Sequence, residues 1–262
     1  SSVLDDFLYS SIMTSLGSKT KQIVMEWGIF GEYHVLFNIP VALANALSSS
    51  LIPALTMAVA SHDRQKTLSQ IRVSIRFTLL IAVPCSIGMA VLADPLSRML
   101  FPGKNVHLLI QLTRVGSFAV LLYSLSTITN AILQGLGHLN LPLYHSMIAL
   151  VLHLLSLVLF LYAGFGIYGV VLSNIVFALI MCFLNQRAIF RHTRFRIDLF
   201  RSLVMPMFSA VIMGGASYVI YFVIFILLPE GLRKGRVGSA LSLLPAVFIA
   251  ILIYFFLLLR SH

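Results

Sequence analysis

The chain has 262 residues, of which 59% are hydrophobic and only 10% are charged, and its mean hydropathy is +0.99. Because soluble domains carry roughly 25% charged residues, this composition excludes an ordinary soluble protein. The net charge of +10 does not make nucleic acid an expected partner, because the basic residues lie in short bridges between apolar segments and form no continuous stripe. Contact with the headgroups of membrane lipid accounts for them.

The apolar segments predict an all-α, polytopic transmembrane bundle that forms a single domain over residues 1–262. Residues 1–16 have the composition of the end of an apolar helix, so we expect the chain to be a portion of something longer. Asp5 and Asp6 lie in this segment. At membrane depth a carboxylate costs about 2.5 to 3.5 kcal/mol and is usually functional, whereas at an exposed helix end it is merely solvated. Under the first interpretation, Asp6 is the candidate for binding an ion or a proton.

The first complete span is predicted over residues 28–60, after an interfacial connection at 17–27. Asn38, Asn45 and Ser49 recur in it at spacings of seven and four, which places them on one face of a helix. Such a polar face either joins two helices or lines a polar cavity. The sequence leaves both interpretations open.

A second span is predicted over residues 73–93 and a short interfacial helix over 94–103, where two prolines and a glycine turn the chain. The third span begins near His107 and holds Arg114 about two turns in. The guanidinium can extend to the lipid headgroups. Alternatively it faces a wet cavity, where it suits an anionic group such as a phosphate.

The third span also carries the longest polar stripe of the chain. Its members recur at spacings of four, three and four, and therefore share one helix face: Tyr123, Thr127, Asn130 and Gln134. A stripe of this length predicts either a seam between helices or the wall of a polar cavity.

Residues 115–186 contain no Asp, Glu, Lys or Arg, which is typical of a membrane-embedded segment. Turn residues divide it into the end of the third span, a fourth span over 141–162 and a fifth over 167–186, packed as antiparallel helices. His145 and His153 lie eight residues apart in the fourth span, a spacing that matches no metal-ligand pair. They are either neutral and hydrogen-bonded inside the bundle, or they titrate during a transport cycle. The two cysteines match no metal or redox spacing, so we predict no metal and no other cofactor.

Arginines dominate residues 187–201, where Asp198 is the single acid. Such a run is typical of the cytoplasmic side of a membrane, so we predict a basic cytoplasmic loop here. Two further spans, over residues 202–228 and 239–259, bring the prediction to about seven complete spans plus part of one more.

Several short motifs follow one another in an order that carries a family resemblance. They are Asn45-Ala-Leu-Ser-Ser-Ser-Leu-Ile-Pro-Ala54, Ala93-Asp-Pro-Leu-Ser-Arg-Met-Leu-Phe101, Leu133-Gln-Gly-Leu-Gly-His-Leu-Asn-Leu-Pro142, Gly166-Ile-Tyr-Gly169 and Met205-Pro-Met-Phe-Ser-Ala-Val-Ile-Met-Gly214. With these motifs the chain resembles the C-terminal half of polysaccharide biosynthesis proteins of the stage V sporulation protein B type. These are relatives of the lipid II flippases in the multidrug, oligosaccharidyl-lipid and polysaccharide exporter superfamily.

The resemblance implies a two-lobed exporter whose N-terminal half is the partner of this chain. Residues 1–186 would form the second lobe, 187–201 the cytoplasmic loop and 202–262 two additional C-terminal helices. It also implies a flippase in the cell membrane, without enzymatic activity. Such a protein moves lipid-linked oligosaccharide or peptidoglycan precursors, carried on a polyprenyl lipid, between leaflets by alternating access.

Under this reading the candidate residues acquire roles. Those proposed for the substrate cavity are Asn38, Asn45, Arg114, Tyr123, Asn130 and Gln134, with the arginine as a phosphate partner. Asp6 and His153 are the candidates for coupling transport to Na⁺ or H⁺. Three alternatives stay open: a multidrug exporter of the same superfamily, a membrane-embedded glycosyltransferase or polymerase, and a scaffold that transports nothing.

Overall fold

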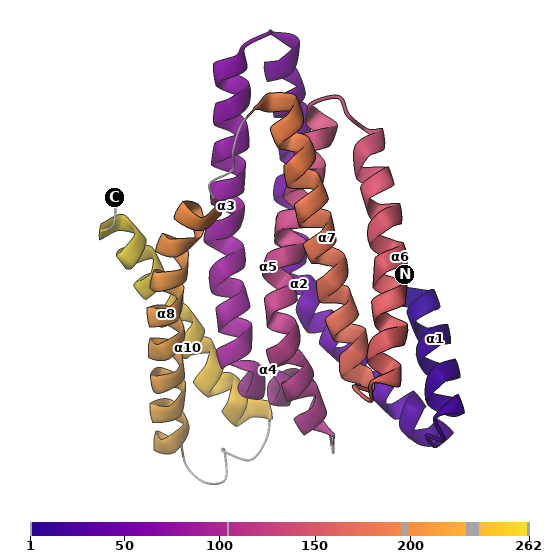
Figure 1. Ribbon diagram of the computed structural model, residues 1–262. Helices are drawn as coiled ribbons and strands as arrows, with labels where there is room; N and C mark the ends of the chain where they lie inside the picture. Colours follow the sequence, from indigo (N-terminus) through magenta and orange to yellow (C-terminus); the bar gives the residue numbers. More distant parts are fainter. Residues whose placement is uncertain (1, 104, 195–198, 229–235, 261–262) are drawn as a thin grey trace.

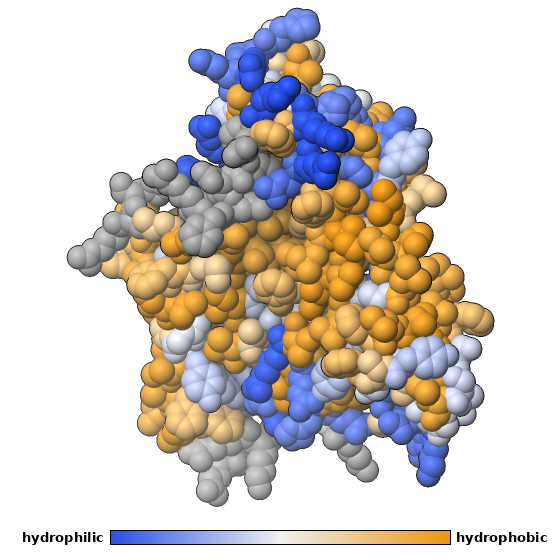
Figure 2. All heavy atoms as spheres, in the orientation of Figure 1, coloured by the Kyte–Doolittle hydropathy of each residue, from blue (hydrophilic) through white to orange (hydrophobic). Residues whose placement is uncertain are grey.

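Helices make up all the regular secondary structure in the part of the chain that the structure describes (Figure 1). This computed structural model describes residues 2–103, 105–194, 199–228 and 236–260. Seven of the described helices are long and apolar enough to cross a membrane. Figure 2 shows a broad apolar band between two polar ends of the molecule. The prediction of an all-α, multi-pass membrane protein is therefore confirmed.

The helices follow one another with short connections. Their bounds are α1 Ser2–Ser15, α2 Thr20–Ala60, α3 Arg64–Val91, α4 Ala93–Leu100, α5 Val106–Gly135, α6 Asn140–Tyr162, α7 Ile167–Thr193, α8 Leu199–Leu227 and α10 Arg236–Arg260. The short α4 confirms the helix predicted after the second span. The turns at 61–63 and 136–139 and the end of α7 lie together at what we call the basic end. The turns at 16–19, 101–103 and 163–166 lie at the opposite end (Figure 1).

Several helices extend beyond their predicted bounds, three of them by about two turns. α2 begins at Thr20, so most of the predicted interfacial connection is helical, and a hydrogen bond of 2.8 Å from Gln22 Nε2 to Glu26 Oε1 joins its first turns. α3 begins well before its predicted start, because Asp63 caps it by accepting a hydrogen bond of 2.9 Å from the backbone N–H of Lys66. α7 continues to Thr193, which places the first part of the predicted basic loop in a helix. The middle of that loop, at 195–198, lies outside the described residues.

α2 is longer than a bilayer requires. Its 41 residues correspond to about 60 Å of helix, whereas the hydrocarbon core of a membrane is about 30 Å thick. Figure 1 shows that the α2–α3 hairpin projects past the other helices at the basic end. The hairpin therefore carries its polar turn well away from the apolar band.

α5 lies at the centre of the bundle and packs against α2, α3 and α7. Two glycines let it approach α2 closely. A Cβ added to Gly116 would lie 2.2 Å from the hydroxyl oxygen of Tyr33, and one added to Gly135 would lie 2.9 Å from Leu55 Cβ. Small residues at such crossings allow helices to pack tightly in a membrane, where no hydrophobic force drives them together.

The remaining helices flank this centre on two sides (Figure 1). α8 and α10 pair with each other and lie against α3, where Gly214 leaves room for Ile87. The hydroxyl of Tyr254 on α10 donates a hydrogen bond of 3.0 Å to the carbonyl of Leu80. On the other side α6 packs against α7, and α1 lies against α6. The polar residues described below lie in this centre and along its contacts with the two flanks.

The close approach of α2 and α5 gives a test of the fold. We expect Gly116→Leu to lower the thermal stability of the purified protein at its native length, because overpacking of a core site costs about 1–3 kcal/mol. The matched control is Gly215→Leu, since a Cβ at Gly215 meets nothing within 4 Å. Melting temperatures measured in detergent should fall for the first variant only. Equal melting temperatures for the two variants would contradict the described packing.

Candidate functional site

A cavity of about 490 Å³ lies between α1, α2, α5 and α7. We call it the polar cavity after the side chains that line it, which are Asp5, His34, Asn38, Asn45, Tyr123, Thr127 and Asn174. Aromatic side chains of α2 form much of the remaining wall. Each of these helices thus contributes polar groups to one space. Three of the lining residues were predicted from the sequence to lie in a cavity: the two asparagines of α2 and the tyrosine of α5.

The two asparagines of α2 reach the polar cavity because they are seven residues apart and share a helix face. Both are exposed, so the bundle itself does not bury their amides. Asn38 Nδ2 lies 2.9 Å from Nδ1 of His34, one turn earlier. Ser49, which the spacing also placed on this face, does not line the cavity, and its hydroxyl donates instead to the carbonyl of Asn45 at 2.9 Å.

Tyr123 closes the cavity on the side of α5 and α7. Its hydroxyl donates to Asn174 Oδ1 at 3.3 Å. Its ring stacks on Phe177 at a centroid distance of 6.1 Å and meets the edge of Phe37 at 5.2 Å. These three contacts hold the side chain in place, with its hydroxyl at the cavity wall.

The second half of the polar stripe on α5 does not line the polar cavity, and its Asn130 contacts α7 instead. Asn130 Oδ1 accepts a hydrogen bond of 2.7 Å from Nδ2 of Asn185, which also donates to Thr129 Oγ1 at 3.1 Å. Nδ1 of His145 donates to Asn185 Oδ1 at 2.7 Å. Asn185 is fully buried, so its amide ties α5, α6 and α7 together. We call these four residues the Asn185 hub. Gln134 is half-buried further along α5 and does not line the polar cavity.

His153 has an acidic partner that is distant in sequence. Its Nε2 lies 2.8 Å from Oδ1 of Asp5, and the two residues are 0% and 3% exposed. The pair joins α6 to α1 beside the polar cavity. Asp6, the sequence candidate, is only half-buried and accepts a hydrogen bond of 3.3 Å from the hydroxyl of Ser10. Neighbouring residues of a helix face different directions, and only Asp5 faces α6.

The described residues contain no group of three or more His, Cys, Asp or Glu side chains that could hold a metal ion. Both histidines of α6 are bonded to other partners, one to the Asn185 hub and one to Asp5. Both histidines are therefore hydrogen-bonded inside the bundle.

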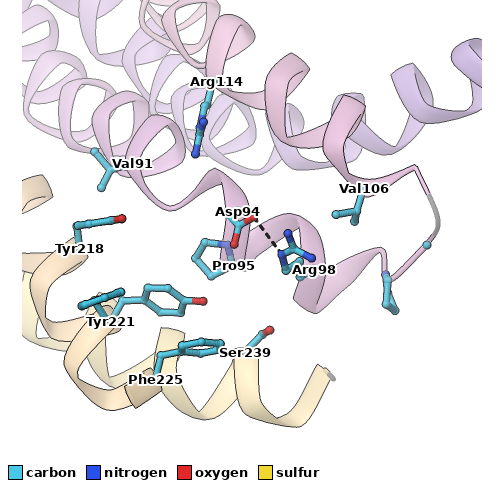
Figure 3. A pocket seen from close by; sticks show the side chains of 13 residues that line it. Val91, Asp94, Pro95, Arg98, Val106, Arg114, Tyr218, Tyr221, Phe225 and Ser239 are labelled. Carbon is cyan, nitrogen blue, oxygen red and sulfur yellow. Dashed lines mark hydrogen bonds and ion pairs between the residues drawn. The ribbon is translucent and has the colours of Figure 1, made fainter. Parts of the chain in front are cut away.

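Arg114 lines a separate cavity. It measures about 920 Å³ and lies between the end of α3, α4, α5, α8 and α10, near the opposite end of the bundle (Figure 3). We call it the aromatic cavity, because Tyr218, Tyr221, Phe222 and Phe225 of α8 form one of its walls. It shares no lining residue with the polar cavity. The structure thus separates the predicted phosphate partner from the predicted asparagine wall.

Comparison with known proteins identifies relatives for most of the chain. The family described as "Lipid II flippase MurJ" matches residues 29–232. The probable lipid II flippase MurJ of Bdellovibrio bacteriovorus is 24% identical over 226 residues, which cover 84% of this chain and 42% of that protein. The chain therefore spans about two fifths of the length of this relative.

Solved structures show the same fold. The inward closed conformation of a lipid II flippase MurJ superposes with a TM-score of 0.63 at 16% identity, covering 88% of this chain and 46% of that one. An inward-facing multidrug resistance transporter of the MATE family superposes with a TM-score of 0.60 at 18% identity, covering 96% and 59%. At these identities the likeness concerns the arrangement of helices.

Two asparagines of α7, Asn185 and Asn174, should contribute unequally to the stability of the protein. We expect Asn185→Ala to lower the melting temperature of the purified protein, because it leaves one buried and two half-buried partners without a hydrogen bond, and each such loss in a buried site costs about 1–3 kcal/mol. Asn174→Ala, three turns away on the same helix, removes only one hydrogen bond of 3.3 Å at the cavity wall and should change the melting temperature little. Equal melting temperatures of the two variants would contradict a stabilising role of the Asn185 hub.

Proposed function

Because the chain belongs to the lipid II flippase MurJ family, we propose that it forms one lobe of a transporter that moves a lipid-linked sugar or peptidoglycan precursor between membrane leaflets by alternating access. The observation that carries this proposal is the polar cavity. Its asparagines line an open space in an apolar bundle, whereas Asn130, His145 and Asn185 join helices. A second lobe, contributed by further residues of the same protein, would cover the cavity.

The physical task of such a transporter is to keep a large polar headgroup away from hydrocarbon. A hydroxyl or amide moved into an apolar medium without hydrogen bonds costs about 2–7 kcal/mol, and a sugar carries several such groups. Each asparagine offers two donors and an acceptor that can replace water around the headgroup. The apolar tail needs no such partners and can stay in lipid along the surfaces of α8 and α10.

The charge of the polar cavity argues against a cationic drug as the substrate. Among its described lining residues the only carboxylate is that of Asp5, and its Oδ1 is bonded to His153. A drug cation would gain most from a carboxylate that has no other partner. Neutral amides and hydroxyls suit sugars better, so the observations favour a lipid-linked saccharide over the substrates of a multidrug exporter.

The basic end of the bundle is proposed to face the cytoplasm. Arg64 and Lys66 begin α3 there, and Arg187 and Arg191 lie in the last turns of α7. Positive residues next to transmembrane helices favour the cytoplasmic side. The aromatic cavity then lies in the outer half of the membrane.

The pair formed by Asp5 and His153 is proposed to couple transport to a proton, with Na⁺ as the other candidate ion. Histidine changes its charge near physiological pH, and a buried carboxylate is stable only with a partner. Occupation of either group by an ion or a proton would alter the one side-chain bond described between α1 and α6. Since α1 also lines the polar cavity, such a change would reach the substrate site directly.

The cavity assignment is tested by replacing both asparagines of α2. Asn38→Leu combined with Asn45→Leu should slow the exchange of a fluorescent polyprenyl-pyrophosphate sugar in vesicles by about tenfold or more, since each lost hydrogen bond costs about 1 kcal/mol. The matched control replaces both by serine, which keeps a polar group at each site and should retain most of the exchange. Membrane insertion and yield should be unchanged in both. Normal exchange by the double leucine variant would exclude these residues from the substrate path.

The coupling assignment is tested by exchange with and without an imposed ion gradient. His153→Gln should abolish stimulation by the gradient while basal exchange persists, because His153 does not line the polar cavity. Asp5→Asn should abolish the stimulation as well. Asp6→Asn is the matched control, because it changes the adjacent carboxylate, which does not contact His153. Separate proton and Na⁺ gradients identify the ion. Stimulation that survives in both variants, or that is lost equally in the control, would overturn the assignment.

A further inference from the structure

The aromatic cavity combines positive charge with an apolar wall. Among the described residues that line it, the charged ones are Asp94, Arg98 and Arg114, which leave one positive charge in excess. Arg98 Nε lies 3.0 Å from Asp94 Oδ1, so these two residues of α4 largely neutralise each other. The guanidinium of Arg114 forms no ion pair with any described residue. The excess charge therefore resides on α5.

The direction of Arg114 shows that it serves the cavity. In Figure 3 its side chain extends from α5 into the space between the helices, toward Asp94, and the hydroxyl ends of Tyr218 and Tyr221 point into the same space from α8. An arginine side chain that only extended to the membrane surface would run parallel to its own helix, toward the headgroups. Here three donors from two helices converge on one region, an arrangement that suits a phosphate.

The depth of the cavity matches a lipid better than a soluble ion. Arg114 is eight residues from the start of α5, or about 12 Å along the helix axis. Arg98 is nearly half exposed at the mouth. Phe222 and Tyr218 are each about half exposed on α8, a helix whose outward face is apolar. A soluble anion gains nothing from such a wall, whereas a lipid chain does.

We propose that the aromatic cavity binds a membrane phospholipid, with its phosphate at Arg114 and the hydroxyls of Tyr218 and Tyr221, and the start of its acyl chains against the aromatic face of α8. A volume of about 920 Å³ accommodates a headgroup with part of its chains. The site is distinct from the polar cavity, with which it shares no residue. The lipid is a resident component that fills the seam between the α3–α5 unit and the α8–α10 pair, and it does not depend on the transported substrate.

The test compares an anionic with a zwitterionic phospholipid on the purified protein at its native length. Native mass spectrometry of mixed micelles reports bound dioleoyl phosphatidylglycerol and dioleoyl phosphatidylcholine. We expect phosphatidylglycerol to bind preferentially, and Arg114→Gln to weaken its binding about tenfold, the effect of one charge-assisted hydrogen bond. Arg114→Lys should bind with intermediate affinity, because it keeps the charge but loses the forked geometry.

Lys21→Gln is the matched control, since it removes an exposed positive charge at the same end of the molecule without touching the cavity. It should leave lipid binding unchanged. Equal binding of both lipids by the unaltered protein, or an equal loss in the control, would overturn the proposal. So would complete displacement of the lipid by millimolar glycerol 3-phosphate, which would assign the site to a soluble phosphate. Tyr221→Phe, which removes a hydroxyl and keeps the packing, should lower the affinity for phosphatidylglycerol less than Arg114→Gln does.

Discussion

Hydrogen bonds between side chains at membrane depth determine how this bundle is held together. In a bilayer the apolar surfaces of helices gain little by leaving lipid, so close packing and polar contacts decide which faces meet. The Asn185 hub joins α5, α6 and α7, and the pair of Asp5 and His153 joins α1 to α6. Glycines at the crossing of α2 and α5 complete the arrangement by letting the two backbones approach. These contacts fix how α1, α2, α5, α6 and α7 meet.

Some polar side chains of the bundle do not join helices, and these need another explanation. Asn38 and Asn45 are exposed on a helix whose opposite face is fully packed. Polar residues are costly in a membrane protein, and those that do not join helices usually face water or a ligand. Their location in the polar cavity, beside Tyr123 and Asn174, is therefore the clearest indication of transport in the structure.

Spacing within a helix could be predicted from the sequence, but contacts between helices could not. The interval of seven residues correctly placed Asn38 and Asn45 together. The stripe on α5 was also correct as a face, yet Asn130 lies about 10 Å further along the axis than Tyr123, where it meets Asn185 instead of the cavity. The choice between Asp5 and Asp6 depended on the direction of α6, whose histidine is 148 residues away in the chain. Arg114 was expected in a wet cavity or at the headgroups, and only the packing of α8 showed which space it enters.

The seam between α5 and α7 contains several polar contacts, which include a hydrogen bond of 3.2 Å from Cys182 Sγ to the carbonyl of Leu122 and one from the hydroxyl of Tyr168 to Gln111 Oε1. Near the basic end, the buried amide of Asn185 is bonded to three partners, whereas toward the opposite end Tyr123 and Asn174 share one long hydrogen bond beside an open space. Along both helices, the bond between Tyr168 and Gln111 and the bonds of Asn185 lie on either side of the residues that line the polar cavity. This part of the cavity wall is therefore anchored at both of its ends.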